Sequence, residues 1–387
     1  MKIAVIGVGT AGIQTLCYLL GHLPDIFEVH SVHDPDIKIL GIGESTTTAL
    51  PYALRTGAGF TMLDDGNELE TTTKHGVRYE NWTEEHWHTH ILPPQFAMHF
   101  NNFKLGEVIL PKLKTRWAAR FQTIEGKLSN ISQNENSVEL VINNETHLYD
   151  YIVDCRGYPE DYSDYEILTD LPVNHCLVHT VNKPGDWNFT YHKAHRNGWM
   201  FGIPLKTRQG WGYLYNDTIT SKDDAMSEIA EIFNTKIEDL NLREFTFKNY
   251  YAKKVFDGRI IKNGNRALFF EPLEALSGYF YESVCVKTVN FLLNGYLEEE
   301  LNNQLTEEAL KYENFICYVY HKGSIFDTEF WKITKEKTKL HLDNSPLWHE
   351  HLRACKLFNH LKMNENLILP PVSIYLWNIV TEKLRIF

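Results

Sequence analysis

Three glycines near the N-terminus have the spacing that binds the pyrophosphate of a dinucleotide. Gly7, Gly9 and Gly12 form a G-x-G-x-x-G motif, with Thr10 and Ala11 between the last two. The first glycine permits a tight turn, the second lets the backbone approach a pyrophosphate, and the third lets a helix pack closely on a strand. The N–H groups at the start of that helix would then face the phosphates. A purely structural turn is the alternative interpretation.

The elements that must position this motif follow from the hydrophobic pattern. The apolar run 2–6 predicts a strand, positions 13–20 predict a helix, and the run 27–32 completes a βαβ unit. An acidic residue about 20 positions after the motif is expected to bind the ribose. Asp34 has that place, although His33 beside it blurs the assignment.

Two further loops are expected to contact the same cofactor. The glycine-rich turn 41–48 contains Gly43, Glu44 and Ser45. Asp154 follows the apolar strand 151–153, in a loop of the kind that ends a strand beside a bound cofactor. Because no second G-x-G-x-x-G occurs, the sequence supports one dinucleotide and no separate site for NAD(P)H.

Composition excludes several classes of protein. The chain has 387 residues, enough for two domains, with 38 Lys and Arg against 50 Asp and Glu and a net charge of −12. This charge repels phosphate backbones and anionic lipid, so neither a nucleic acid nor a membrane is an expected partner. The six cysteines are dispersed without a C-x-x-C, which predicts free thiols in a reducing cytoplasm.

Periodicity predicts the remaining elements. We expect a helix over 115–121, a hairpin formed by 128–131 and 138–142, antiparallel sheet between 173 and 216, and helices from about 278 onward.

With these residues placed, the chain resembles the flavin-dependent tryptophan halogenase family from residue 1 to about residue 332. Four signatures beyond the glycine motif carry the resemblance and follow in family order. They are G-I-G-E-S-T at 41–46, N-G-W-M-F-G-I-P-L at 197–205, E-P-L-E at 271–274 and D-T-E-F-W at 327–331.

The resemblance implies an α/β fold. Its core would be an FAD-binding, Rossmann-like domain of the glutathione-reductase type, with an inserted, mostly antiparallel substrate sheet and a helical C-terminal part. The halogenase module would cover 1–332 and the short helical C-terminal region 333–387. The flavin-binding segments would be 1–50, 100–158 and 255–300, and the substrate-side segments 51–99 and 159–254.

The activity implied by the resemblance is halogenation of an electron-rich aromatic ring, indole-like, tryptophan-like or phenolic. Reduced FAD from a separate flavin reductase, O2 and a halide (chloride, bromide or iodide) generate hypohalous acid, which passes through an internal tunnel to a lysine. Lys74 begins the run K-H-G-V-R-Y-E-N-W at 74–82, which is similar to the family's lysine motif. Without the motif, a lysine that follows three threonines would be expected on the solvated surface.

Glu274 matches the family's catalytic glutamate, which polarises hypohalous acid or takes the proton from the cationic ring. The alternative is a purely structural role, in which Glu274 lies in the first turn of a helix and is stabilised there by the helix dipole. The family's halide-binding amides correspond to Leu276 and Ser277, although the surrounding side chains differ. A backbone nest can hold an anion whatever the side chains are.

The W-x-W-x-I-P signature assigns tunnel or substrate contacts to Trp199, Phe201, Ile203 and Pro204, and Phe201 replaces its second tryptophan. His88 lies in the run H-W-H-T-H at 86–90. These histidines would form a wall of the substrate pocket or be structural or surface residues, and a metal site is the least favoured alternative. We assign no metal to it.

Two departures leave the substrate open. The chain is shorter than the family pattern before residue 271, and its C-terminal helical region, with which tryptophan halogenases hold free tryptophan, is reduced. The main alternative function is an FAD-dependent aromatic monooxygenase, and a flavin-binding module without chemistry is a third. Neither alternative needs Lys74 and Glu274.

Overall fold

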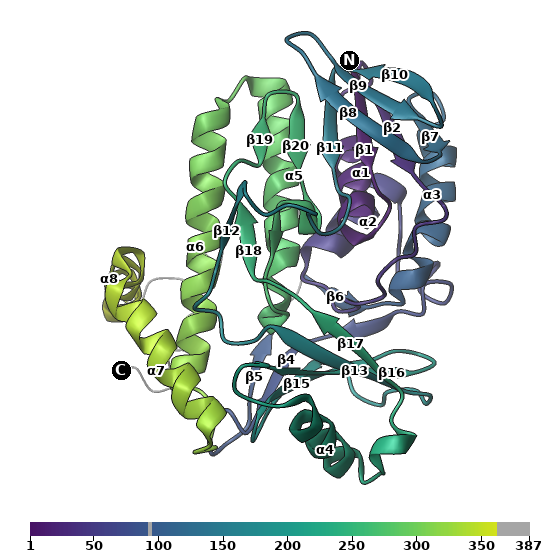
Figure 1. The fold of residues 1–387 in the computed structure, drawn as a ribbon. Coiled ribbons are helices and arrows are strands. Elements are labelled where there is room, and N and C mark those ends of the chain that lie inside the picture. The colour runs from purple at the N-terminus through teal and green to yellow at the C-terminus, as the bar shows by residue number, and fades with distance from the viewer. Residues whose placement is uncertain (92–94, 362–387) are drawn as a thin grey trace. The chain divides into compact units, whose positions relative to one another are not determined.

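The computed structural model describes residues 1–91 and 95–361, which form two compact units (Figure 1). The first unit contains Met1–Thr72, Ala97–Ile167 and Tyr250–Thr306. The second contains Thr73–Phe96, Leu168–Asn249 and the chain from Glu307 onward. The two units are therefore interleaved along the sequence.

The core of the first unit is a six-stranded sheet with the order β19-β20-β11-β1-β2-β7. Its strands are β1 (Lys2–Ile6), β2 (Glu28–His33), β7 (Phe121–Glu125), β11 (Tyr151–Asp154), β19 (Phe256–Asp257) and β20 (Ile260–Lys262). The ladders from β20 to β7 are parallel, and β19 is antiparallel to β20. All residues of β1 except Lys2 are buried, as expected for a central parallel strand that is covered on both faces.

Helices pack against this sheet around α1. They are α1 (Thr10–His22), α2 (Ala49–Ala58), α3 (Leu105–Arg116) and α5 (Leu276–Asn294). Helix α1 contacts the other three helices and also β1 and β2. An antiparallel meander of β8 (Leu128–Gln133), β9 (Val138–Ile142) and β10 (Glu145–Tyr149) packs against Ala4 and Ile6 of β1. The predicted Rossmann-like α/β fold is confirmed.

Short elements complete the first unit. They are β6 (Ala97–His99), β12 (Tyr165–Ile167), β18 (Tyr250–Ala252), β21 (Leu268–Phe269) and the 3-10 turns η1 (Asn102–Lys104), η3 (Gly264–Arg266) and η4 (Leu273–Ala275). Strand β3 (Thr72–Lys74) lies where the chain passes from the first unit to the second.

The predicted hairpin over 128–142 is confirmed, but the predicted helix over 115–121 is wrong. Helix α3 starts ten residues earlier, because buried Leu105, Ile109 and Leu113 recur every four positions. It ends at Arg116, since Trp117 leaves the helical conformation and its indole N–H donates to the carbonyl of Gly57 at 2.7 Å. Strand β7 then begins at Phe121.

The second unit is built on a seven-stranded sheet with the order β17-β13-β16-β15-β14-β4-β5. Its strands are β4 (Gly76–Glu80), β5 (Trp87–His90), β13 (His175–Val181), β14 (Thr190–His195), β15 (Gly198–Pro204), β16 (Gln209–Tyr215) and β17 (Leu242–Thr246). The ladders are antiparallel as predicted, except that β14 and β4 run parallel. Helix α4 (Lys222–Phe233) packs through Ala225 and Ile229 against this sheet, and the 3-10 turn η2 (Ile237–Asp239) follows it.

From Leu276 to Leu361 the chain is mostly helical, which confirms the helices predicted from about residue 278 onward. Helix α6 (Glu298–Lys322) begins in the first unit, and α7 (Glu329–Asn344) and α8 (Pro346–Leu361) follow in the second. The predicted C-terminal helical region beyond Leu361 lies outside the described residues. Among the residues described, no helix combines the length and apolar character needed to cross a bilayer.

Candidate active site

The glycine motif forms the turn between β1 and α1, and each glycine has a different structural reason. Gly7 has a φ of +98°, and a Cβ there would lie 2.9 Å from the carbonyl oxygen of Cys155. A Cβ on Gly12 would lie 1.9 Å from the carbonyl oxygen of Gly7. Gly9 meets no atom within 4 Å of its Cβ position and is the N-cap of α1, without a side-chain cap. The motif thus leaves the N-terminus of α1 open on the side of Gly9, the cradle that a pyrophosphate requires.

The loop 41–48 is fixed to the rest of the first unit by backbone hydrogen bonds. Gly43 has a φ of +86° and, like Gly9, no atom within 4 Å of its Cβ position. The carbonyl of buried Glu44 accepts from the N–H of Phe100 at 3.0 Å, and Ser45 forms an isolated bridge with His99. The loop is therefore a fixed strap whose glycine leaves open space for a ligand.

Asn102 joins the glycine motif to this strap, and no sequence signal identified it. Its side-chain oxygen accepts from the hydroxyl of Thr10 at 3.0 Å, and its side-chain nitrogen donates to the carbonyl of Ile42 at 3.1 Å. Its backbone N–H donates to the Glu44 carboxylate at 3.3 Å. Asn102 is buried and makes these bonds from the turn before α3.

The two predicted aspartates both follow the carboxyl ends of parallel strands. Asp34 comes directly after β2, and its carboxylate accepts from the N–H of Asp36 at 2.9 Å. Asp154 ends β11, beside Ile6 of β1. Its carboxylate accepts from Arg156 at 2.8 and 2.9 Å and lies 3.5 Å from the guanidinium of Arg266. Asp154 is thus a buried, paired carboxylate, and the two arginines are neighbours that sequence patterns did not reveal.

The predicted halide site lies at the start of α5. Glu274 and Ala275 are consecutive non-glycine residues in the left-handed region, with φ of 57° and 55°. Such conformations cost about 1–3 kcal/mol each and gather at functional sites. Ala275 supplies no side-chain cap, so Leu276 and Ser277 begin α5 with N–H groups that have no acceptor within the helix. This is a backbone nest at a helix N-terminus, the setting that attracts an anion.

The strap and the start of α5 are in contact within the first unit. A Cβ on Gly278 would lie 3.4 Å from Thr47. Burial raises the pKa of the Tyr279 phenol to about 12, while a side-chain hydrogen bond with Thr48 acts in the opposite direction. The predicted cofactor strap and the predicted anion site are therefore neighbours.

Lys74 belongs to the second unit and is buried, contrary to the expectation for a solvated lysine. It ends β3, and the next N–H, that of His75, donates to the carbonyl of Asn188 at 2.7 Å. Its charge acts on His192 of β14, whose pKa is lowered well below its usual value by burial first and by Lys74 second. Sequence reasoning missed His192.

Aromatic rings surround His192 on one face of the seven-stranded sheet. Its ring lies 5.1 Å from that of Tyr79 and 4.9 Å from that of Trp199. Phe201 is its register partner on β15, and Ile203 follows on the same face. All seven residues of β15, including Pro204, are buried. Trp199, Phe201 and Ile203 therefore form a packed wall close to Lys74, whereas Pro204, the next residue after Ile203, lies on the opposite face of the strand.

His88 does not join this wall. It pairs with Arg78, whereas Trp87 pairs with Tyr79, and adjacent residues of a strand face opposite sides of a sheet. His88 accordingly lies on the face opposite to Trp199 and stacks near His90 at 5.9 Å.

A different cluster in the second unit has the donor types of a metal site. The Nδ1 of His341 lies 2.9 Å from the carboxylate of Asp170 and 3.8 Å from that of Glu313, and its Nε2 lies 3.0 Å from the side-chain oxygen of Asn314. Both ring nitrogens thus have hydrogen-bond partners within the protein.

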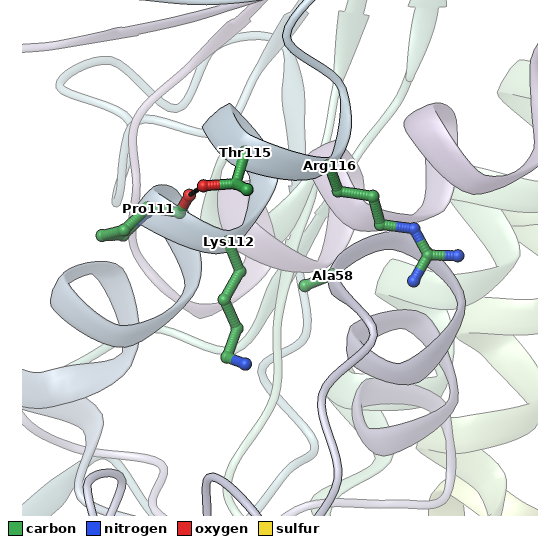
Figure 2. A pocket seen from close by; sticks show the side chains of 5 residues that line it. All are labelled: Ala58, Pro111, Lys112, Thr115 and Arg116. Atoms are coloured by element: carbon green, nitrogen blue, oxygen red, sulfur yellow. Dashed lines mark hydrogen bonds between the residues drawn. The ribbon is translucent and has the colours of Figure 1, made fainter.

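A hollow of about 370 Å³ lies between the end of α2 and the last turns of α3 (Figure 2). It is lined by Ala58, Pro111, Lys112, Thr115 and Arg116. Lys112 pairs with Asp65 at 2.5 Å. None of the predicted site residues lines this hollow.

The chain is similar to known proteins in both sequence and structure. The family model described as tryptophan halogenase matches residues 2–93 and 88–345. Tryptophan 7-halogenase RebH of Lentzea aerocolonigenes is 22% identical, over 87% of this chain and 79% of its own. Tryptophan 6-halogenase ThaL of Streptomyces albogriseolus is 21% identical, over 86% of this chain and 78% of its own. The structure of a tryptophan halogenase from Shewanella frigidimarina superposes with a TM-score of 0.82 at 16% identity, covering 100% of this chain and 89% of its own.

Proposed function

The chain belongs to the tryptophan halogenase family, and from that premise we propose how its own residues serve the reaction. The protein is a flavin-dependent halogenase, an enzyme that requires a separate flavin reductase and acts on an aromatic substrate. FAD, a halide and O2 are the reactants that the family implies. When bound, reduced FAD would supply, with O2 and the halide, the hypohalous acid that the reaction consumes.

The flavin would be held at the carboxyl edge of the six-stranded sheet. The open N-terminus of α1 and the empty space beside Gly9 and Gly43 support this placement. Asp34 would take the ribose, and Asp154 would act through its arginine pairs. The other residues that we propose for this site are Gly7, Thr10, Ala11, Gly12, Glu44 and Ser45.

The halide would be held by the N–H groups of Leu276 and Ser277. Two residues in the left-handed region, Glu274 and Ala275, directly precede these groups, and the dipole of a 19-residue helix adds positive potential. Because the contacts are backbone groups, this arrangement accepts chloride, bromide or iodide.

Lys74 would deliver the oxidant to the substrate. Hypohalous acid is small and unselective, so regioselectivity requires one fixed donor close to the ring. A lysine amine can hold hypohalous acid by a hydrogen bond or react with it as a nucleophile. The single observation that carries this role is the burial of Lys74 close to the aromatic wall of Trp199 and Phe201.

Glu274 would handle the proton of the reaction. A ring carbon that gains halogen becomes cationic and must then lose a proton, and a carboxylate both stabilises that charge and accepts the proton. Its left-handed backbone fixes the carboxylate at the entrance to α5.

The substrate that we propose is an electron-rich indole or phenol, and tryptophan is the substrate named for the relatives RebH and ThaL. Trp199, Phe201 and Ile203 would line the path of oxidant or substrate, whereas Pro204 and His88 could serve only on the opposite face of their sheet. A reducing, cytoplasmic location accords with the free thiols of Cys17, Cys155, Cys176, Cys285 and Cys317.

The test is an assay with FAD, a generic flavin reductase, each halide in turn and a panel of indoles and phenols, read by mass spectrometry. We expect a halogenated product from the wild-type enzyme and none from Lys74→Ala, while flavin oxidation by O2 continues in both. Lys193→Ala is the matched control, because Lys193 lies in the same unit, is partly exposed and pairs with Glu80. Halogenation by Lys74→Ala at the wild-type rate would contradict the delivery role, and a product heavier by one oxygen would indicate a monooxygenase.

A further inference from the structure

Asp170, Glu313 and His341 form a group of side chains in the second unit that the proposed reaction does not use. One ligand-type atom from each residue lies within 4.8 Å of those from the other two. Asp170 lies in the loop between β12 and β13, Glu313 lies on α6, and His341 lies on α7. Because the three residues come from separate segments, no spacing in the sequence reveals them.

The hydrogen bonds of His341 determine where its lone pair points. Its Nε2 lies 3.0 Å from the side-chain oxygen of Asn314, which is an acceptor, so Nε2 carries the hydrogen. A neutral ring then directs the lone pair of Nδ1 toward the carboxylate of Asp170, which lies 2.9 Å away. Two lone pairs at this distance repel each other. A cation must therefore lie between the nitrogen and the oxygen, and it is either a proton or a metal ion.

A proton accounts for only part of this geometry. It would be shared between Nδ1 and Asp170, whereas the carboxylate of Glu313 lies 3.8 Å from Nδ1, beyond hydrogen-bond range. Two carboxylates and one imidazolium would also keep one net negative charge within the group, although the Glu313 side chain is only 6% exposed. A divalent cation contacts all three residues and balances both carboxylates.

The donor atoms suit a transition metal. Imidazole nitrogen and carboxylate oxygen bind Zn²⁺ at about 2.0–2.2 Å, which places tetrahedral ligand atoms about 3.4 Å apart. The two distances from Nδ1, 2.9 and 3.8 Å, lie on either side of this value. Asn314 supplies the outer contact that metal-bound histidines have, because its oxygen accepts from the other ring nitrogen. The side chain of Asp170 is 41% exposed, which leaves the ion a route from solvent, and water can supply the fourth ligand.

The loop that carries Asp170 is held in place independently of a metal ion. The ammonium of Lys337, one turn before His341 on α7, donates to the carbonyl of Thr169. This bond keeps the carboxylate of Asp170 close to α7, so little conformational freedom remains to be lost when an ion binds.

We propose that Asp170, Glu313 and His341 bind a divalent transition-metal ion, for which Zn²⁺ is the probe. The ion is structural, because it joins the loop after β12 to both α6 and α7. The inference is independent of halogenation and goes beyond the proposed function.

Helices α6 and α7 also support the aromatic wall of the second unit. The hydroxyl of Tyr320 on α6 accepts from the indole N–H of Trp199 at 2.5 Å. On α7, the indole N–H of Trp331 donates to the carbonyl of His195 at 2.7 Å. The metal ion therefore fixes the two helices on which this wall rests.

The first experiment measures zinc binding by the full-length protein after a chelator has removed its metal. Competition with a coloured zinc indicator should give one high-affinity ion per chain, with a Kd of about 1 µM or below. Asp170→Asn keeps the size of the side chain and removes its charge, and His341→Ala removes a ligand. We expect each to weaken zinc binding at least about tenfold, a loss that even the outer contacts of a metal site can cause.

Two other histidine variants serve as matched controls. His349→Ala removes an exposed histidine of α8 whose ring contacts the carbonyl of Asp343. His88→Ala removes the middle histidine of the run 86–90, where neighbouring imidazoles could also bind zinc. We expect both variants to keep the high-affinity zinc site.

The second experiment compares thermal unfolding of each variant with and without zinc, so that any effect of the substitution on folding cancels. Zinc at about 100 times its Kd should raise the Tm of the wild type by about 5 °C. The same zinc concentration should leave the Tm of Asp170→Asn almost unchanged.

The outcomes are decisive for this site alone. Equal zinc affinity in the wild type, Asp170→Asn and His341→Ala would overturn the proposal, and so would loss of the high-affinity site in His88→Ala only. A wild type that binds no zinc at micromolar concentrations would show that a proton bridges His341 and Asp170, which also refutes the metal site. None of these results bears on halogenation, so the proposed function stands or fails separately.

Discussion

Gly12→Ala tests whether different glycines of the motif serve packing and cofactor binding. In this interpretation Gly12 lets helix α1 pack against the turn, and Gly9 leaves room for the cofactor. The new Cβ would lie 1.9 Å from a backbone oxygen, and an ordinary contact begins at 3.4 Å. Helix α1 would therefore have to move about 1.5 Å from the turn, although it packs on β1, α2 and α5. Overpacking typically costs about 1–3 kcal/mol, and a rigid backbone on both sides places this site at the upper end.

Thermal unfolding of the flavin-free protein measures this cost. At about 2–4 °C per kcal/mol for a domain of this size, we expect Gly12→Ala to lower the Tm by about 6–12 °C. Gly9→Ala is the matched control, because the new Cβ meets no atom within 4 Å. Its only expected cost is about 1 kcal/mol, because alanine is a poorer helix N-cap than glycine.

The same pair of variants separates stability from flavin binding. The Gly9 Cβ would project where we place the pyrophosphate, so we expect Gly9→Ala to weaken FAD binding at least tenfold, or about 1.4 kcal/mol, in a fluorescence titration. A Gly12→Ala protein as stable as the wild type would refute the packing argument. Unchanged FAD affinity in Gly9→Ala would refute the placement of the cofactor.

Three further predictions concern single residues. Glu274→Gln should lower the rate of halogenation by about 10² to 10⁴ with unchanged flavin oxidation, because an amide cannot accept the proton of the ring; a wild-type rate would remove Glu274 from the reaction. Asn102→Ala should weaken FAD binding about tenfold, since it frees the strap from the glycine motif, and an unaltered fluorescence titration would contradict this. Burial lowers the pKa of His195 to about 3, so protonation of this ring favours the unfolded chain. The free energy of unfolding should therefore fall as the pH drops below 6.5. We expect His195→Gln to remove about 2 kcal/mol of the decrease in this free energy between pH 7 and pH 5, measured by denaturant titration at each pH.

Sequence patterns predicted correctly those features that depend on residues adjacent in sequence. The turn at Gly7 and the hairpin closed around 134–137 depend on local conformation, and both lie where the pattern places them. The helix expected over 115–121 failed because a tertiary contact of Trp117, its bond to Gly57, overrides the local pattern.

The parts of the site that sequence could not predict depend on contacts between distant segments. The burial of Lys74 depends on strands that follow it by more than 100 residues, and nothing in its own threonine-rich segment signals this. No sequence pattern marks Asn102 or Arg266, because their polar contacts are with segments far away in sequence. Residues of this kind become visible only when the strands are paired.

The interleaving of the two units also constrains how the chain is made. Strand β20 adds to the central sheet of the first unit only after residue 262 has been synthesised, and β4 must wait for β14, more than 100 residues later. Pairings of such long sequence separation form slowly and leave strand edges exposed to other chains meanwhile. No single truncation therefore isolates either unit, and an isolated second unit would require its three segments to be joined directly to one another along one chain.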